Sequence, residues 1–229
     1  MSASHPFSFG LLVGRFQMPH LGHQYMIDTA LAVCDRVGVL VGSAQESGTA
    51  MNPFSYELRY DMLRELYDDR IAIAPLPDIG VGNTSAWGNY VLLKAQEAFG
   101  AKPDLVVSGA EGRRISWFHK EALPSACQLH QNAPGQSFPI KSVPEADTSR
   151  YTDCPAAAGN VIPENNSHGI AELYLPKIIN ISASEMRAFL LHDNYAEWSS
   201  FIDPRLHGRY EELRGLVLAS DAHKETGSL

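Results

Sequence analysis

His20 and His23 lie three residues apart with Gly22 between them, shortly after an apolar run that ends at Gly14 and Arg15. At that spacing two side chains can share one face of a first helical turn. The first N–H groups of a helix are unpaired, and the helix dipole favours anions. The pattern therefore predicts a site where two imidazoles, backbone N–H groups and a guanidinium donate to phosphate oxygens.

The same spacing also fits a structural role, in which His20 caps a helix and His23 sits in the core. The elements around the histidines bear on this choice. Phe9–Val13 and Val37–Val41 are short apolar runs, and the segment between them carries apolar residues at near-helical spacing. Apolar strands joined by a helix indicate a parallel sheet that is covered on both faces.

The strand and helix pattern continues for at least four steps, which predicts a Rossmann-like, doubly wound parallel α/β sheet with a C-terminal helical segment. We expect helices near Phe54–Tyr67 and Ser85–Phe99, and strands near Ile71–Ala74 and Asp104–Ser108.

After residue 111 the composition changes. Leu123–Ser167 is rich in Pro, Gly, Ser, Asn and Ala, and we interpret it as a long insertion, either a functional lid or a mobile segment. Order is expected again at Glu172–Leu175 and Ile178–Ile181. Helices should follow near Ser184–Leu191 and Pro204–Leu218, ahead of a frayed tail at 220–229. We predict one domain over 1–192 with the insertion at about 123–167, and a C-terminal helical extension over 193–229.

Bulk composition narrows the classes of function. The chain has 229 residues, 45% of them apolar, and a net charge of −8, which argues against a nucleic-acid surface and leaves room only for a local basic pocket. The three cysteines show no CxxC pair, and neither a signal core nor a membrane-spanning run is visible. These features predict a cytoplasmic protein with no membrane or nucleic-acid partner.

The segment GRFQMPHLGH resembles the first motif of the HxGH nucleotidyltransferase superfamily, GRFQPxHxGH. The matching residues are Gly14, Arg15, Phe16, Gln17, His20, Gly22 and His23. The chain departs at Met18, where the family usually has proline. Because Pro19 follows one place later, we expect the turn to change without moving either histidine.

A second segment, ISASEMR at residues 181–187, is similar to the superfamily's ISxTxxR phosphate motif. On physical grounds, Ser182 and Ser184 are plausible N-caps, and Arg187 lies one turn inside the helix, where it could reach a polyphosphate. Taken alone, the segment would fit an ordinary capped helix with a surface arginine.

The loop GSAQESGTAMNPFSYELR, residues 42–59, resembles the corresponding loop of the archaeal-type nicotinamide-nucleotide adenylyltransferases. Arg59 matches that pattern, and we predict that it binds the acceptor. In the same family an Asn and a Trp at the start of a later helix hold the nicotinamide ribotide, and Asn83 and Trp87 have that spacing. Stacking and cation–π attraction suit an indole to a charged pyridine ring, although core packing explains a lone Trp87 equally well.

The resemblance implies an adenylyltransferase that joins nicotinamide mononucleotide to the AMP part of ATP, giving NAD and pyrophosphate. His20, His23 and Arg187 would be catalytic. Gly14, Arg15, Phe16, Gln17, Gly22, Ser182 and Ser184 would bind ATP, and Mg²⁺ would arrive bound to the nucleotide. The family also implies a homo-oligomer of unspecified size.

Alternatives stay open at this stage. The fold also suits a cytidylyltransferase, a pantetheine-phosphate type adenylyltransferase, or a nucleotide-binding regulator without turnover. Arg113 and Arg114 could bind phosphate or simply be solvated. His119, His130 and His168 show no zinc-ligand spacing, so we predict no protein-bound metal. The sequence does not decide between nicotinamide and nicotinic acid mononucleotide.

Overall fold

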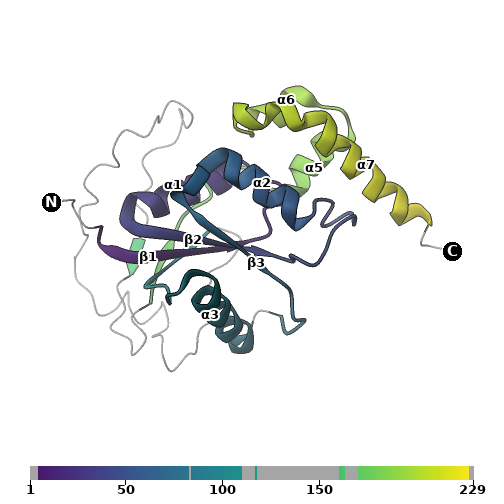
Figure 1. Ribbon diagram of the computed structural model, residues 1–229. Helices are drawn as coiled ribbons and strands as arrows, with labels where there is room; N and C mark the ends of the chain where they lie inside the picture. Colours follow the sequence, from purple (N-terminus) through teal and green to yellow (C-terminus); the bar gives the residue numbers. More distant parts are fainter. Residues whose placement is uncertain (1–4, 83, 110–116, 118–159, 163–169, 227–229) are drawn as a thin grey trace. The chain divides into compact units, whose positions relative to one another are not determined.

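The computed structural model describes residues 5–82, 84–109, 117, 160–162 and 170–226 of the chain (Figure 1). Its strands form one sheet in the order β3-β2-β1-β4-β6-β5. Their bounds are β1 Phe7–Gly14, β2 Cys34–Gly42, β3 Ala72–Leu76, β4 Leu105–Ser108, β5 Asn160–Ile162 and β6 Ala171–Tyr174.

The central strand pairs are parallel. β1 pairs with β4 in the register Gly10 to Leu105, and β4 pairs with β6 in the register Leu105 to Ala171. Five strands run parallel and are flanked by helices, so the predicted Rossmann-like sheet is confirmed. The strand order reverses at β1, and open α/β sheets bind ligands beyond the carboxyl end of the strand at such a switch point.

The helices are α1 Leu21–Val33, α2 Tyr56–Tyr67, α3 Ser85–Phe99, α5 Ala183–Leu191, α6 Tyr195–Ser200 and α7 Tyr210–Thr226. Two 3₁₀ segments add to them, η1 Asp68–Arg70 and η4 Pro204–Arg209. In Figure 1 the C-terminal helices α5, α6 and α7 lie together. No helix in the described part of the chain is both long and apolar enough to cross a membrane.

Several predictions about elements need correction. Asn160–Ile162, inside the expected insertion, forms the short strand β5, antiparallel to β6. Ile178–Ile181, where order was expected, forms neither a helix nor a strand, and helix α6 was not predicted. The tail, expected to fray from residue 220, is helical as far as Thr226.

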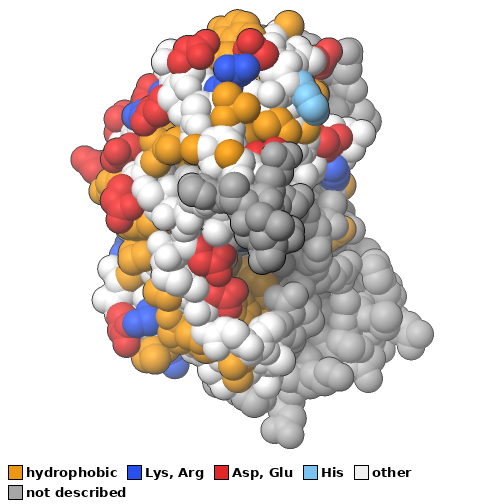
Figure 2. Space-filling model, turned by 90° about the vertical axis from the view of Figure 1, so that its right-hand side faces the viewer, with side chains coloured by type: hydrophobic (Ala, Val, Ile, Leu, Met, Phe, Trp, Pro, Cys, Tyr) orange, Lys and Arg blue, Asp and Glu red, His pale blue; other side chains and the backbone are white. Residues whose placement is uncertain are grey.

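The strand interiors form the core, as the apolar runs predict. Leu11, Leu12, Val39, Leu40 and Val41 are each 1% exposed or less. Such complete burial within two consecutive strands is expected of a parallel sheet with helices on its faces. Outside the core, Figure 2 shows acidic side chains spread over the visible face, with fewer basic ones, in keeping with the net charge of −8.

The chain divides into two compact units. The first contains residues 1–12, 26–38 and 79–178, and the second contains 13–25, 39–78 and 179–229. The turn after β1, the loop after β2 and the whole C-terminal segment therefore belong to the second unit. The predicted domain boundary at residue 192 stays a prediction.

Candidate active site

The turn after β1 brings the first motif into a defined shape. Phe16 is 3% exposed and has a positive φ of 51°, an uncommon conformation for a bulky residue. A Cβ at Gly14 would lie 3.1 Å from the Phe16 ring, so the glycine makes room for that ring. The ring centroid of Phe16 lies 4.8 Å from that of His23. Phe16 therefore packs beneath a histidine, and the ATP contact predicted for it stays a prediction.

His20 and His23 stand side by side at the start of α1. Their ring centroids are 3.9 Å apart. The His23 Nδ1 accepts from the backbone N–H of His20 at 3.3 Å, and the His20 Nδ1 accepts from the backbone N–H of Gly22 at 3.2 Å. An accepting Nδ1 carries no proton, so the proton of each neutral ring is on Nε2. Each imidazole can therefore present an Nε2–H donor to an anion.

The charge state of His23 is also set by its surroundings. Burial, and secondarily the neighbouring His20, hold the pKa of His23 well below its usual value. His23 is therefore a neutral donor at pH 7. Gly22 leaves room for the His20 ring beside His23, because a Cβ at Gly22 would lie 3.0 Å from the His20 ring atoms Cε1 and Nδ1.

Arg187 approaches the same turn from α5. Its guanidinium donates to the Gln17 carbonyl at 3.2 Å and to the Ser184 Oγ at 3.1 Å. Burial, and then the charge of Arg15, lower the pKa of Arg187, so these two cations are close enough to repel one another. Ser182 is the N-cap of α5, as predicted; its Oγ accepts from the Glu185 N–H at 3.3 Å. Like-charged guanidiniums held together at a helix N-terminus form a site suited to an anion.

Arg59 plays a different part from the one its motif predicts. Its side chain is fully buried and donates to the carbonyl oxygens of Arg15, Gly42 and Ser43 at 2.8 to 3.1 Å, and to that of Ser55 at 3.1 Å. Burial lowers its pKa to about 10, so it stays charged at neutral pH. Arg59 thus fastens the turn after β1 to the loop after β2.

Two glutamines tie the loops of the second unit to backbone. The Gln17 amide pairs with Phe54, donating to its carbonyl and accepting from its N–H, both at 3.0 Å. Gln45 makes the same kind of pair with Asp78, at 3.3 and 2.9 Å. The second pair gives Gln45 of the GSAQ loop a structural role. The first pair also gives the Gln17 side chain a structural role beside its predicted contact with ATP.

Trp87 belongs to the first unit. It lies in the first turn of α3, where its N–H donates to the N-cap hydroxyl of Thr84 at 3.4 Å. Its ring is partly exposed, meets Trp117 edge-on with centroids 6.1 Å apart, and lies 5.6 Å from the Tyr90 ring. A partly exposed indole can stack on a planar ligand.

Other predicted residues lie outside the described residues: Asn83, Arg113, Arg114, His119, His130, His168 and the insertion apart from β5. In the part of the chain that is described, no three His, Cys, Asp or Glu side chains gather closely enough to hold a metal ion.

Sequence reasoning missed a set of buried residues that join the histidine turn to the C-terminal segment, chiefly Gln24 in α1 with Trp198 and Asp203 in that segment. The single available signal was Asp203-Pro204, which is typical of a helix start and indicates nothing about a partner 179 residues away.

Residues 11–111 match the family model described as Cytidylyltransferase-like. The chain is 44% identical over 90 residues to the nicotinamide-nucleotide adenylyltransferase of Saccharolobus solfataricus, covering 37% of this chain and 51% of that protein. It is 47% identical over 87 residues to that of Aeropyrum pernix, covering 35% and 49%. The resemblance stated from the motifs is therefore confirmed in this region, and the chain spans about half the length of the curated relatives it matches.

A solved structure supports the fold over a longer stretch. A bifunctional NMN adenylyltransferase/ADP ribose pyrophosphatase from Francisella tularensis, complexed with AMP and a manganese ion, aligns with a TM-score of 0.57. The alignment covers 96% of this chain and 53% of that one at 17% identity, so it is a likeness of fold.

Proposed function

We propose that this protein is a nicotinamide-nucleotide adenylyltransferase, which joins nicotinamide mononucleotide to ATP and releases pyrophosphate. One observation carries the proposal. Two imidazoles with Nε2–H donors stand at the switch-point turn, and Arg187 reaches that turn from α5. The chain is also 44% identical over 90 residues to an enzyme of this kind.

The reaction needs no protein nucleophile. A phosphate oxygen of the mononucleotide attacks the α-phosphorus of ATP in line, the bond from that phosphorus to the bridging oxygen breaks, and its electron pair leaves with pyrophosphate. The protein contributes positioning and charge stabilisation. His20 and His23 donate Nε2–H groups to the polyphosphate, while Arg15 and Arg187 neutralise the charge that builds on pyrophosphate.

The other ATP-binding assignments differ in their support. Gly22 leaves space for the His20 ring and for a nucleotide beside the helix. Ser182 and Ser184 offer hydroxyls in the first turn of α5, next to Arg187. Gly14, Phe16 and Gln17 shape the turn. They would contact the nucleotide through their backbone groups.

For the acceptor, we assign Trp87 as the stacking platform and Asn83 as a polar contact. We no longer assign Arg59 to the acceptor. Its guanidinium donates hydrogen bonds to carbonyl oxygens of the two loops, so we propose that Arg59 positions these loops.

We propose that a divalent ion, Mg²⁺, enters bound to the nucleotide. When bound, it supplies neutralising charge to the polyphosphate. Mg²⁺ keeps much of its hydration and uses few protein ligands, so it fits a site where the described residues form no carboxylate or histidine cluster. Manganese accompanies AMP in the Francisella tularensis protein.

The test is pyrophosphate release from purified protein with Mg²⁺, comparing ATP and CTP as donors. The acceptors are nicotinamide mononucleotide, nicotinic acid mononucleotide, phosphopantetheine and none. We expect release with ATP and a pyridine mononucleotide alone. Release with CTP would favour the cytidylyltransferase alternative that the family description suggests, and nucleotide binding without release under every condition would favour a regulator.

Two variants separate the assigned roles. His23→Ala should lower kcat far more than it raises KM for ATP, because its donor acts chiefly in the transition state. Trp87→Ala should chiefly raise KM for the mononucleotide. Thermal unfolding of both variants checks that the loss is not misfolding.

We also propose that the protein is a cytoplasmic homo-oligomer that binds neither membranes nor nucleic acid. Sedimentation equilibrium at several concentrations tests the assembly, and a monomer throughout would contradict it. Imaging of the tagged chain tests the compartment.

A further inference from the structure

The turn that carries the histidines is held from residues far along the chain. The Trp198 indole Nε1–H donates to the Met18 sulfur at 3.2 Å. Nearby, the backbone N–H of Leu21, the first residue of α1, donates to the Phe201 carbonyl at 2.9 Å. Trp198 is fully buried and Met18 is 1% exposed, so water does not compete for the first contact.

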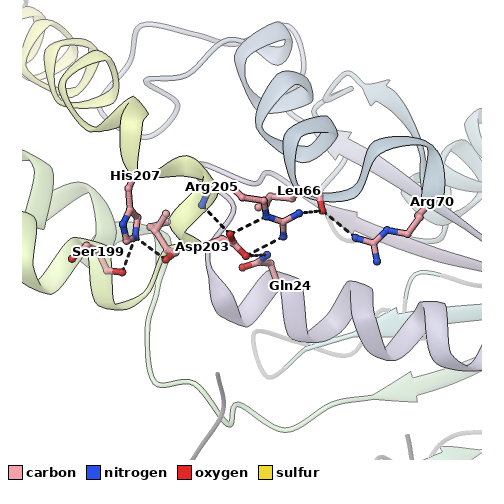
Figure 3. Close-up of polar contacts among 8 residues, drawn as sticks. Gln24, Leu66, Arg70, Ser199, Asp203, Arg205 and His207 are labelled. Atoms are coloured by element: carbon pink, nitrogen blue, oxygen red, sulfur yellow. Dashed lines mark hydrogen bonds and ion pairs between the residues drawn. The ribbon is translucent and has the colours of Figure 1, made fainter. Parts of the chain in front are cut away.

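A third contact is centred on Asp203 (Figure 3). Its Oδ2 accepts from the Gln24 Nε2 at 3.1 Å, while the Arg205 guanidinium donates to both carboxylate oxygens at 3.0 Å. Arg205 also donates to the Leu66 carbonyl at 2.7 Å, at the end of α2. Asp203 is thus bonded at the same time to α1 and, through Arg205, to α2.

This carboxylate is unusual because it is buried and yet charged. Asp203 is 1% exposed, and burial by itself would raise its pKa. The hydrogen bonds from Arg205 and Gln24 outweigh burial and hold the pKa of Asp203 well below its usual range. A charged oxygen forms a stronger and more directional bond to the Gln24 amide than a neutral one would.

The contacted positions bracket both histidines. Met18 precedes His20 by two residues, Leu21 follows it, and Gln24 follows His23 directly. The two rings in turn depend on backbone N–H groups within this turn, since each Nδ1 accepts from one of them. Any shift of residues 18–24 would therefore change where the two Nε2–H groups point.

We propose that Asp203, with Trp198, is a positioning residue that fixes the turn 18–24 and hence the direction of the His20 and His23 donors. The kinetic consequence rests on the proposed function, and the structural consequence does not. Met18, where the family usually has proline, has a use here, because its sulfur supplies the acceptor for Trp198.

The experiment compares Asp203→Ala, Asp203→Asn and Trp198→Phe with the parent chain. Glu65→Gln is the matched control: Glu65 accepts from Arg209 at 2.8 Å, a contact between η4 and α2 that leaves the turn alone. Two kinds of experiment are made. Steady-state kinetics with Mg²⁺, ATP and nicotinamide mononucleotide give kcat and KM, and NMR gives the signals of the histidine Cε1–H groups. Thermal midpoints are recorded alongside.

We expect Asp203→Ala to lower kcat about tenfold with KM changed less than about twofold, since misplaced catalytic groups cost rate more than binding. The signals of His20 and His23 should shift in the Asp203 and Trp198 variants and stay in place in Glu65→Gln. If Asp203→Ala does not fold, Asp203→Asn and Trp198→Phe supply the same comparison, because Asn has the size of Asp and Phe keeps an aromatic ring without the N–H donor.

Lowered thermal midpoints with unchanged kcat and unchanged histidine signals would overturn the proposal in favour of a purely stabilising role. If the parent chain releases no pyrophosphate with any substrate pair, the proposed function fails, and the histidine signals still decide whether Asp203 positions the turn.

Discussion

The histidine pair makes stability depend on pH in a definite direction. The pKa of folded His23 is lowered by burial and by His20, whereas in the unfolded chain it is near 6.5. Below pH 6.5 the unfolded state therefore binds more protons than the folded state, and stability falls as pH falls. We expect the thermal midpoint to drop between pH 7 and pH 5, and to drop less in His23→Gln.

Comparing the two chains removes the contribution of other titrating groups, which they share. Equal slopes of the midpoint against pH in parent and His23→Gln would show that His23 titrates normally in the folded protein. That result would contradict the assignment of His23 as a neutral donor at pH 7.

Gly22 provides a sharper test of ring placement. An alanine there would put its Cβ 3.0 Å from the His20 ring, while alanine at Gly215 in α7 would meet nothing within 4 Å. We expect Gly22→Ala to lower turnover about tenfold with a stability change within about 1 kcal/mol. Gly215→Ala should leave turnover unchanged and raise stability slightly. Steady-state kinetics and urea unfolding of both variants give the answer, and full turnover in Gly22→Ala would contradict the packing argument.

Arg59 and Arg15 separate structure from chemistry among the cations. Arg59→Met leaves the buried carbonyls of Gly42 and Ser43 and the part-buried carbonyl of Arg15 without this donor, so we expect a loss of about 3 kcal/mol in the free energy of unfolding. Arg15 is exposed, so Arg15→Met should change stability by less than about 0.5 kcal/mol and still reduce turnover. Denaturant unfolding with pyrophosphate release measures both, and a stable but inactive Arg59→Met would return Arg59 to the acceptor site.

Residue types were easier to predict from sequence than their partners. The spacing of His20 and His23 was enough to predict that they share one face, because helix geometry fixes it. Gln17 and Arg59 also lie in motifs, yet their side chains bond to backbone carbonyls and N–H groups. A motif match does not say whether a polar group faces a ligand or an unpaired peptide group of a neighbouring loop.

Ser182 at the start of helix α5 has one observed role, capping the helix, and one predicted role, contacting ATP. Substitution can separate the two roles. Removing the hydroxyl with Ser182→Ala should cost about 1 kcal/mol of stability, because the Glu185 N–H loses its acceptor. Ser182→Asn keeps a capping oxygen and should restore that stability. If the hydroxyl also contacts ATP, KM for ATP should rise in both variants.

Thermal unfolding and kinetics of the two Ser182 variants decide between these readings. Full activity in Ser182→Asn would mean that the serine acts as a cap alone, and the predicted ATP contact would be dropped.

Elements were predictable where one physical signal dominated. The buried strands read as continuous apolar runs, and α3 begins and ends at the predicted residues because Thr84 caps it and Gly100 takes the left-handed conformation after it. Helix α6 was missed because it has only six residues, too few for a periodic pattern. Ile178–Ile181 is apolar, but apolarity alone does not distinguish a strand from a connection whose last residue, Ile181, reaches the core.

At the scale of the whole molecule, the C-terminal segment belongs with residues near the start of the chain. Residues 179–229 form a compact unit with 13–25 and 39–78. Sequence order could not predict this grouping, because the contacts that create it, such as Gln24 with Asp203, join distant positions. Part of the predicted extension 193–229 is therefore bonded to the turn after β1, and the predicted boundary at residue 192 stays a prediction.

A truncation series tests this integration. Ending the chain at residue 192 removes Trp198, Ile202, Leu206 and Leu213, each 2% exposed or less, and strips Met18 and Gln24 of their partners. Each lost buried side chain costs about 2 kcal/mol. Several such losses together are comparable to the whole free energy of unfolding of a typical domain. We expect the 1–192 chain to lose cooperative thermal unfolding, while a chain ending at residue 222 keeps it. A 1–192 chain with the parent's thermal midpoint would show instead that the extension is a separable appendage. The contacts that Asp203 makes to the histidine turn would then not be required for that turn to fold.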